Sequence, residues 1–140
     1  MASTTETDRA FDQIRNAWAK GDFSGVSELM TADVKYHMPP IGDFDLAGIS
    51  EFVSGFRQAF PDFDVFVDET IAEGDLVSWL WHCSATFSGE SPAVPVKPTG
   101  KPSAATGTLV ARFKDGRIVE VWHHGDWMTW LQMDLGASAN

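Results

Sequence analysis

Hydrophobic residues follow a helical spacing in the first half of the chain and a strand spacing in the second. Phe11, Ile14 and Trp18 recur every three or four residues, which predicts an amphipathic helix over about residues 6–19. Gly21 ends this helix. The first element is therefore predicted to be a helix whose apolar face packs in a hydrophobic core.

Three further elements are predicted before the chain turns to strands. A short helix capped by Asp22 or Ser24 is followed by alternating residues over 34–38, typical of a short strand that Pro39-Pro40 ends. A third helix opens at Ser50 and closes before a proline. Its apolar stripe consists of Ile49, Phe52, Val53, Phe56 and Phe60.

The second half of the chain alternates apolar and polar residues with turn residues between the runs. Asp115-Gly116 predicts a type I′ hairpin turn, because both of its central positions need positive φ. Glycine and proline are concentrated in residues 89–102, which predicts a loop. The predicted strands cover about residues 63–67, 76–87, 104–113 and 118–126, and a closing helix over about 127–135 is ended by Gly136.

Helices followed by hairpin-connected strands favour an α+β fold in which helices pack on one side of an antiparallel sheet. We expect residues 6–136 to form a single domain, with a flexible tail at residues 1–5 and a short tail at 137–140.

Composition adds an aromatic interior and excludes two classes of partner. The chain has six Trp, ten Phe and one Tyr, and such rings line pockets as well as filling cores. The net charge of -10 disfavours nucleic acid and anionic membranes, and no apolar run approaches the roughly 20 residues of a membrane span. We expect a soluble, cytoplasmic protein. Cys83 is the single cysteine, so no disulfide can form within the chain.

In this order of elements, several short segments resemble the SnoaL-like polyketide cyclases of the NTF2-like superfamily. Residues 20–38 contribute Gly21-Asp22 and Ala32-Asp33-Val34. The others are Ala59-Phe60-Pro61-Asp62, Ala72-Glu73-Gly74-Asp75, Pro98-Thr99-Gly100-Lys101, Asp115-Gly116-Arg117-Ile118-Val119-Glu120-Val121-Trp122 with Asp126 after it, Leu131-Gln132 and Leu135-Gly136. The resemblance extends over nearly the whole chain.

This resemblance implies a cone-shaped, curved antiparallel sheet packed against the N-terminal helices, with a pocket inside the cone. It also implies no cofactor and, as in many relatives, a homodimer, and we expect a small apolar substrate. In the characterised cyclases an acidic residue on the last strand acts as acid and base in an intramolecular aldol closure, and Asp126 matches it. Ala85-Thr86-Phe87 and Leu80 depart from the polar residues of many relatives, which makes the expected pocket wall more apolar.

Side-chain alternation predicts which residues of the last strand face the pocket. Glu120, Trp122, His124 and Asp126 share one face, and Val119, Val121 and His123 share the other. With a two-residue turn, Lys114 pairs with Arg117. Leu109, Ala111 and Phe113 then fall on the face of Asp126, which we take as the inner one.

A carboxylate on an apolar inner face is suited to acid-base chemistry, because partial desolvation raises its pKa. Asp126 is therefore the candidate base, and His124 the candidate that donates to the enolate oxygen or orients the carboxylate. Asp126 is equally placed to cap the closing helix. His37, at the end of the first strand, is a third catalytic candidate or a surface residue, whereas His82 and His123 are expected outside.

The residues expected to line the pocket come mainly from the long strands. Trp79, Trp81, Cys83 and Phe87 share one strand face, although each can equally be core filling. Arg112 is expected to pair with a neighbouring carboxylate. No histidine spacing favours a metal site. The candidate substrate-binding residues are Trp79, Trp81, Phe87, Trp122, Tyr36, Phe56, Leu109 and Glu120.

The leading hypothesis is a cofactor-independent cyclase or isomerase for a polyketide-like carbonyl compound. Two alternatives stay open at this point. An epoxide-opening or other ring-forming enzyme needs a second inward carboxylate, from Glu120 or Asp45. A binding protein that only sequesters an apolar ligand needs no catalytic group.

Overall fold

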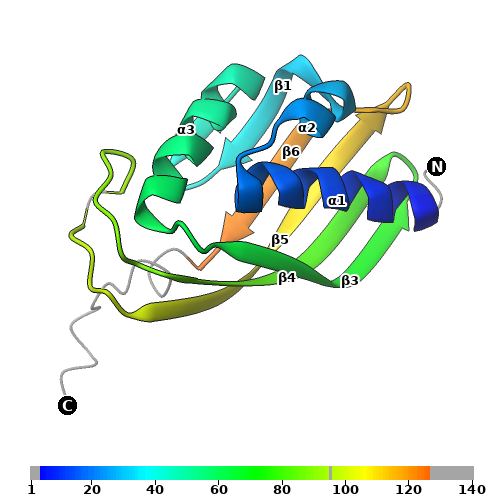
Figure 1. The fold of residues 1–140 in the computed structure, drawn as a ribbon. Coiled ribbons are helices and arrows are strands. Elements are labelled where there is room, and N and C mark those ends of the chain that lie inside the picture. Colours follow the sequence, from blue (N-terminus) through cyan, green and yellow to red (C-terminus); the bar gives the residue numbers. More distant parts are fainter. Residues whose placement is uncertain (1–3, 95, 127–140) are drawn as a thin grey trace.

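The computed structural model describes residues 4–94 and 96–126 and consists of one curved, open sheet with three helices on its inner side (Figure 1). Six strands lie in the order β2-β1-β6-β5-β4-β3. The predicted closing helix and C-terminal tail lie outside the described residues. The elements are α1 (Thr4–Lys20), α2 (Ser24–Leu29), β1 (Met30–Met38), β2 (Gly42–Phe44), α3 (Leu46–Ala59), β3 (Asp64–Glu73), β4 (Leu76–Thr86), β5 (Pro102–Lys114) and β6 (Arg117–Gly125).

The three predicted helices are present, and their starts and ends have local causes. Gly21 has φ 71°, a left-handed conformation that ends α1 at little cost. Asp22 accepts a hydrogen bond from the Ser24 amide over 3.0 Å at the start of α2. The prediction that Ser50 opens α3 is wrong, because Asp45 is its N-cap and accepts a 2.8 Å hydrogen bond from the Gly48 amide.

The sheet is antiparallel except at one junction. β1 pairs with β6 in parallel, and every other neighbouring pair is antiparallel. The expectation of a fully antiparallel sheet therefore needs this correction. Hairpin turns set the direction of consecutive strands, whereas nothing local sets it for β1 and β6, which are far apart in the chain. The short strand β2 was not predicted.

The hairpin between β5 and β6 contains a bulge that changes the register of β6. Asp115 and Gly116 have φ 53° and 79°, as the predicted type I′ turn requires. Lys114 pairs with Arg117 as expected. Farther along, Phe113 pairs with Ile118 but Arg112 pairs with Glu120, so Val119 is an extra residue in β6.

This one-residue shift reverses the predicted faces of β6, because side chains alternate along a strand. Leu109 and Ala111 face the core as predicted, but their partners are His123 and Val121. Val121 and His123 are buried, whereas His124 is exposed. The predictions that Glu120, Trp122 and His124 point inward and that His123 points outward are therefore wrong.

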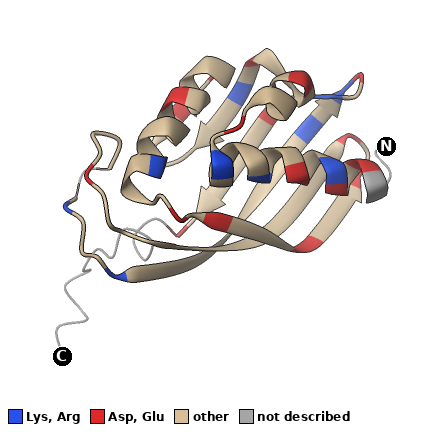
Figure 2. Cartoon of the chain, in the orientation of Figure 1, with Lys and Arg blue, Asp and Glu red and all other residues tan. Residues whose placement is uncertain are grey.

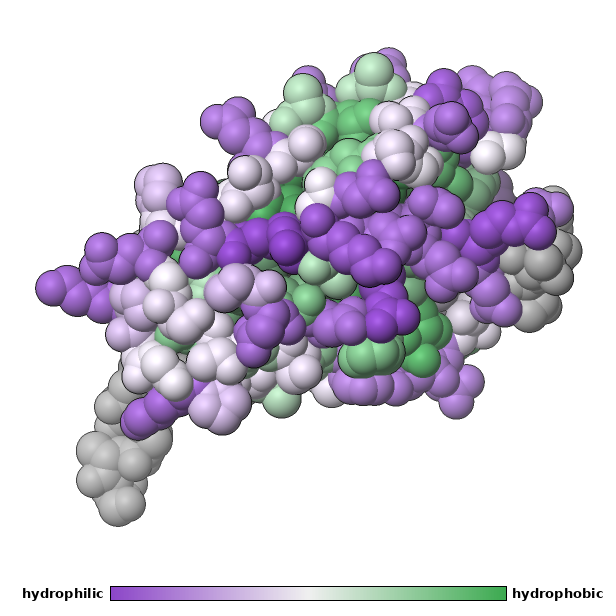
Figure 3. Space-filling view, in the orientation of Figure 1, coloured by the Kyte–Doolittle hydropathy of each residue, from purple (hydrophilic) through white to green (hydrophobic). Residues whose placement is uncertain are grey.

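The hydrophobic core lies between the inner face of the sheet and the three helices. Trp79 of β4 and Phe87 just after it are fully buried, and Trp81 and Cys83 of β4 are also buried, as predicted. In Figure 2, acidic and basic residues are interspersed over several elements. In the view of Figure 3, hydrophobic atoms show mainly between hydrophilic side chains. Among the described residues, no helix is long and apolar enough to cross a membrane.

Candidate functional site

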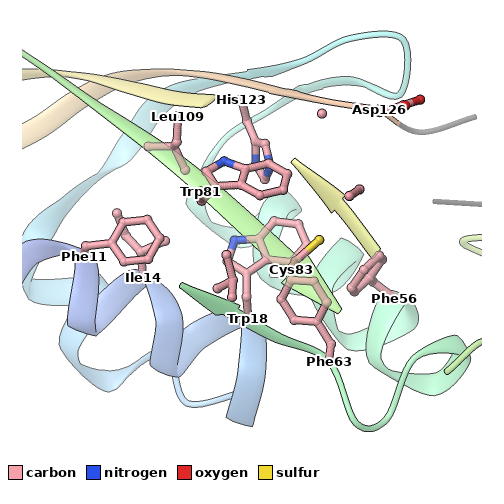
Figure 4. Close-up of a pocket in the computed structure, with 13 residues that line it drawn as sticks. Phe11, Ile14, Trp18, Phe56, Phe63, Trp81, Cys83, Leu109, His123 and Asp126 are labelled. Carbon is pink, nitrogen blue, oxygen red and sulfur yellow. The ribbon is translucent and has the colours of Figure 1, made fainter. Parts of the chain in front are cut away.

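A small cavity lies at the centre of the core, between α1, α3 and the inner face of the sheet (Figure 4). Its volume is about 40 Å³, room for a few water molecules and well below the roughly 300–1,000 Å³ of pockets that hold whole ligands. Rings and aliphatic groups form nearly all of the wall. The lining residues are Phe11, Ile14, Trp18, Phe56, Phe63, Val65, Trp81, Cys83, Ala105, Leu109, His123, Gly125 and Asp126.

His123 is the one imidazole among the described residues of this wall. It is 7% exposed, and the rings of Trp18 and Trp81 meet it edge to face at centroid distances of 5.3 and 5.6 Å. Its Nδ1 lies 2.8 Å from the hydroxyl oxygen of Tyr36, which is itself buried. Burial, with a smaller contribution from the neighbouring His124, lowers the pKa of His123 to about 3. The imidazole is therefore neutral at physiological pH.

Tyr36 is the buried partner of His123. Trp18 of α1 has an effect on the pKa of Tyr36 that is smaller than that of burial and opposite to it. Burial raises the pKa of Tyr36 far above that of an exposed phenol, so its hydroxyl keeps its proton. A buried hydrogen bond thus joins two neutral groups, Tyr36 of β1 and His123 of β6, beside the Trp18 ring of α1.

Asp126 lies just past the end of β6, where the cavity meets solvent. It lines the cavity and is exposed, and Figure 4 shows its carboxylate beyond the cluster of rings. Among the described lining residues it is the only carboxylate. The proposed cap of a closing helix falls on residues outside the described range.

The structure brings only some of the predicted substrate-binding residues to the cavity. Trp81, Phe56 and Leu109 line it. Trp79 and Phe87 are buried in the core but do not line the cavity, and Trp79 packs against Phe11 of α1. Tyr36 reaches the cavity through His123. Burial of large rings was predictable from the pattern, whereas the choice of rings around the cavity depends on helix placement.

His37 lies on the outer face of the sheet and joins two carboxylates. Its Nε2 is 2.7 Å from Glu120 and its Nδ1 is 2.9 Å from Asp43, and these bonds raise the pKa of His37, Glu120 having the larger effect. Trp122 lies beside it at a ring centroid distance of 5.8 Å. Neither this group of outer-face residues nor the exposed His124 lines the cavity.

The other outer-face predictions are confirmed. Arg112 pairs with Asp75 over 2.9 Å. His82 bonds Asp68 over 2.8 Å on the exposed side of β4.

A second carboxylate does not accompany Asp126 in the cavity wall of the described residues. Glu120 is bonded to His37 on the other face of β6, and Asp45 caps α3. This arrangement counts against the two-carboxylate epoxide mechanism. Within the same part of the chain, no cluster of three or more His, Cys, Asp or Glu residues is placed to hold a metal ion. Burial raises the pKa of the Cys83 thiol to about 12, which disfavours a thiolate nucleophile.

The family profile of the SnoaL-like polyketide cyclases matches residues 8–133. The chain belongs to the SnoaL-like polyketide cyclase family. A search of curated proteins gave no match. The matched range includes every residue that lines the cavity of this SnoaL-like protein.

Solved structures agree with this SnoaL-like fold. IdmH from Streptomyces antibioticus, provisionally assigned as a polyketide cyclase, is 29% identical with a TM-score of 0.78, covering 91% of this chain and 96% of its own. AclR from Streptomyces galilaeus, provisionally assigned as a hydroxylase, is 27% identical with a TM-score of 0.76, covering 93% and 96%. A provisional polyketide cyclase from Acidithiobacillus ferrooxidans is 27% identical, with a TM-score of 0.76 and coverage of 94% and 96%.

The sequence interpretation missed several of the lining residues, among them Trp18 and His123. Trp18 was placed in the core but not in the pocket, and His123 was placed outside. The only local signal for His123 was its position among valines, which reads equally as an outer or inner face until the bulge at Val119 is known.

Proposed function

We propose that this SnoaL-like protein closes a ring in a small apolar carbonyl compound by acid-base catalysis, without a cofactor, and that Asp126 is the acid-base residue. The observation that supports it best is the composition of the cavity wall. In the described residues, an otherwise apolar wall carries one carboxylate, Asp126, and one imidazole, His123. Family membership supports a cyclase in general.

The reaction needs one base and a hydrogen-bond donor. The Asp126 carboxylate removes a proton from the carbon next to a carbonyl group, and the electron pair moves to the carbonyl oxygen as an enolate. The enolate carbon attacks a second carbonyl of the same molecule, forming the ring bond and an alkoxide. The protonated Asp126 returns its proton to that alkoxide. Atoms and charge balance, and no oxidant or reductant is required.

The cavity dimensions limit how a substrate binds. A space of about 40 Å³ accommodates the reacting carbonyl and its neighbouring atoms, but not a whole polyketide. We therefore propose that the reacting end of the substrate enters the cavity beside Asp126 and that the rest of a larger substrate stays outside it. This places the base at the entrance, where the carbon that loses its proton would lie.

The proposal is tested with a synthetic poly-β-keto thioester that cyclises slowly by itself. Product formation is followed by liquid chromatography and mass spectrometry with wild type, Asp126→Asn and Asp33→Asn. Asp33 is an exposed carboxylate on β1 away from the cavity, and serves as the matched control. We expect wild type and Asp33→Asn to accelerate closure, and Asp126→Asn to lose roughly 100-fold or more in rate.

Three outcomes would contradict this assignment. Full activity of Asp126→Asn excludes that carboxylate as the acid-base group. A product heavier by one oxygen atom indicates hydroxylation, the activity provisionally assigned to AclR. Quenching of tryptophan fluorescence with no product over long incubation, tested with several chain lengths, favours a protein that only binds its ligand.

A further inference from the structure

The indole of Trp81 fills a space that two glycines leave open on the inner face of the sheet. Trp81 of β4 pairs with Gly107 of β5, which pairs in turn with Gly125 of β6. A methyl group built on Gly107 would lie 2.3 Å from Cζ2 of the indole, and one built on Gly125 would lie 3.1 Å from Cη2. The six-membered ring thus takes up the room that side chains at both positions would need.

This ring also forms part of the cavity wall, beside its polar groups. Trp81 is buried, and its ring meets that of His123 edge to face at a centroid distance of 5.6 Å (Figure 4). Gly125 immediately precedes Asp126, and both residues line the same cavity as the ring. The volume that the indole occupies therefore adjoins the chain next to the proposed acid-base group.

The space that remains is too small for a ring. It measures about 40 Å³, whereas an apolar cavity that binds benzene measures roughly 150 Å³. Indole is larger than benzene, so the Trp81 side chain takes the place of at least one ring. The end of an open chain, which is a carbonyl between a methyl and a methylene group, is narrower than a ring and needs less room.

The other large rings of the wall hold the helices in place. Trp18 of α1 meets Phe56 of α3 at a centroid distance of 5.4 Å, and both rings contact Phe63, at 6.1 and 5.1 Å. Replacing one of these rings would loosen the packing between helices. Trp81 instead lies over strand backbone at two glycines, so a smaller residue there changes the cavity without separating α1 from α3.

We propose that Trp81 determines the size class of the substrate. Its ring takes the place of a substrate ring beside Asp126, so the protein accepts an open-chain carbonyl end and excludes a carbonyl that belongs to a preformed ring. The reaction that supplies the substrate must then deliver a chain whose reacting end is not yet cyclised. This inference rests on the proposed function for the part played by Asp126, whereas the size limit is measurable by binding alone.

The first experiment compares two ketones with equal numbers of carbon and oxygen atoms. The carbonyl of 2-decanone stands near the end of an open chain, and that of 1-tetralone belongs to a fused ring. Binding to wild type is followed in proton-nitrogen correlation spectra, where shifts of the Ala105 and Gly125 amides report occupation of the cavity. We expect wild type to bind 2-decanone roughly 10-fold or more tightly than 1-tetralone, a difference of about 1.4 kcal/mol.

Wild type alone can overturn the proposal, whether or not any variant folds. Equal affinity for the two ketones or tighter binding of 1-tetralone would contradict a limit set by ring size. Absence of shifts at the Ala105 and Gly125 amides with both ketones would contradict entry of an open-chain end.

The second experiment replaces the indole. In Trp81→Ala we expect the affinity for 1-tetralone to rise roughly 10-fold or more, because the vacated space is apolar and large enough for a ring. Trp79→Phe is the matched control, since Trp79 lies two residues away on β4 and is buried but does not line the cavity. It should keep the preference of wild type. An equal gain in Trp79→Phe would indicate a loosened core and contradict the role of Trp81.

A further replacement tests whether the new ligand occupies the place of the indole. A Cβ atom at Gly125 meets only the Trp81 ring within 4 Å, apart from its neighbours in the chain. Gly125→Val added to Trp81→Ala should therefore refill the space and remove most of the gain for 1-tetralone. A gain that survives this second change places the ligand elsewhere and contradicts the proposal. Trp81→Leu, which removes less volume, serves if Trp81→Ala does not fold.

The size limit and the acid-base assignment fail separately. Suppose that ring closure depends on Asp126 but is as fast when the reacting carbonyl belongs to a preformed ring as when it ends an open chain. That result contradicts the role of Trp81 and leaves the acid-base assignment standing. A preference of wild type for 2-decanone together with full activity of Asp126→Asn would have the opposite meaning.

Discussion

The six-membered ring of Trp81 lies directly against the backbone of Gly107. The two residues are paired across β4 and β5, and Gly107 is in turn paired with Gly125 of β6. A methyl group at Gly107 would lie 2.3 Å from the Trp81 ring and 2.3 Å from the carbonyl oxygen of His124. The absence of a side chain on these two glycines therefore makes room for the ring that forms part of the cavity wall.

Gly107→Ala should lower the free energy of unfolding by about 2 kcal/mol, because a ring and a backbone carbonyl must both move. Urea denaturation measures the loss. Gly25→Ala is the contrasting variant, since a methyl group there meets only the end of the Gln13 side chain, within a helix. It should be neutral or stabilising by up to about 1 kcal/mol. Equal stability of both variants would contradict this account of Gly107.

Acid should destabilise the protein through His123. Its pKa is about 3 in the folded chain and 6.5 for the unperturbed side chain, so between these values the unfolded state binds more protons. Stability therefore falls as the pH drops through this window, by up to about 1.4 kcal/mol per unit. Urea denaturation of wild type and His123→Phe from pH 7 to pH 4 tests this. We expect the free energy of unfolding to fall more steeply with decreasing pH in wild type than in His123→Phe. Equal dependence on pH in the two proteins would show that His123 takes up its proton in the folded state.

His37 should stabilise the protein with the opposite pH dependence. Bonds to Glu120 and Asp43 raise its pKa above 6.5, so the stabilisation is complete below that pH and is lost as the pH rises through the folded pKa. His37→Gln should cost about 1 kcal/mol at pH 6 and less at pH 9. In a double-mutant cycle with Glu120→Gln at pH 6, additive losses would show that the pair is not coupled.

The ion pair between Arg15 and Asp64 should fasten α1 to the edge strand β3. Nε and Nη2 of Arg15 each lie 2.8 Å from one carboxylate oxygen, and the guanidinium lies 4.6 Å from the centre of the Phe66 ring. Both side chains are partly exposed, so Arg15→Ala should cost about 0.5–1 kcal/mol. The loss should shrink in 1 M NaCl.

Lys cannot form the bidentate contact with Asp64. Arg15→Lys should therefore keep less than half of the stability that Arg15→Ala loses. Full recovery by Lys would show that charge alone, rather than the planar fork, accounts for the contribution of Arg15.

Local sequence signals predicted most of the scaffold for reasons that act within a few residues. Phe11, Ile14 and Trp18 form the buried stripe of α1, and Asp115-Gly116 makes the hairpin turn. The start of α3 was missed because Asp45, five residues before Ser50, caps the helix, and the short strand β2 because three residues give little periodicity.

The candidate site was only partly predictable. Trp81, Phe56, Leu109 and Asp126 line the cavity as the sequence suggested, whereas Glu120, Trp122 and His124 do not. The error has a single physical origin, since one extra residue in β6 exchanges the two faces of the strand. A bulge is chosen by how two strands fit each other, and β6 alone does not show it.

By itself, the sequence determined the family, the helical stripes, the turns and the aromatic character of the interior, because each depends on residue type and short-range spacing. Only the tertiary structure decided that His123 and Tyr36 meet 2.8 Å apart, although 87 residues separate them. Their contact requires the parallel pairing of β1 with β6 and the bulge at Val119 together. Long-range pairing of this kind is set by the packing of the whole sheet against the helices, which no single segment encodes.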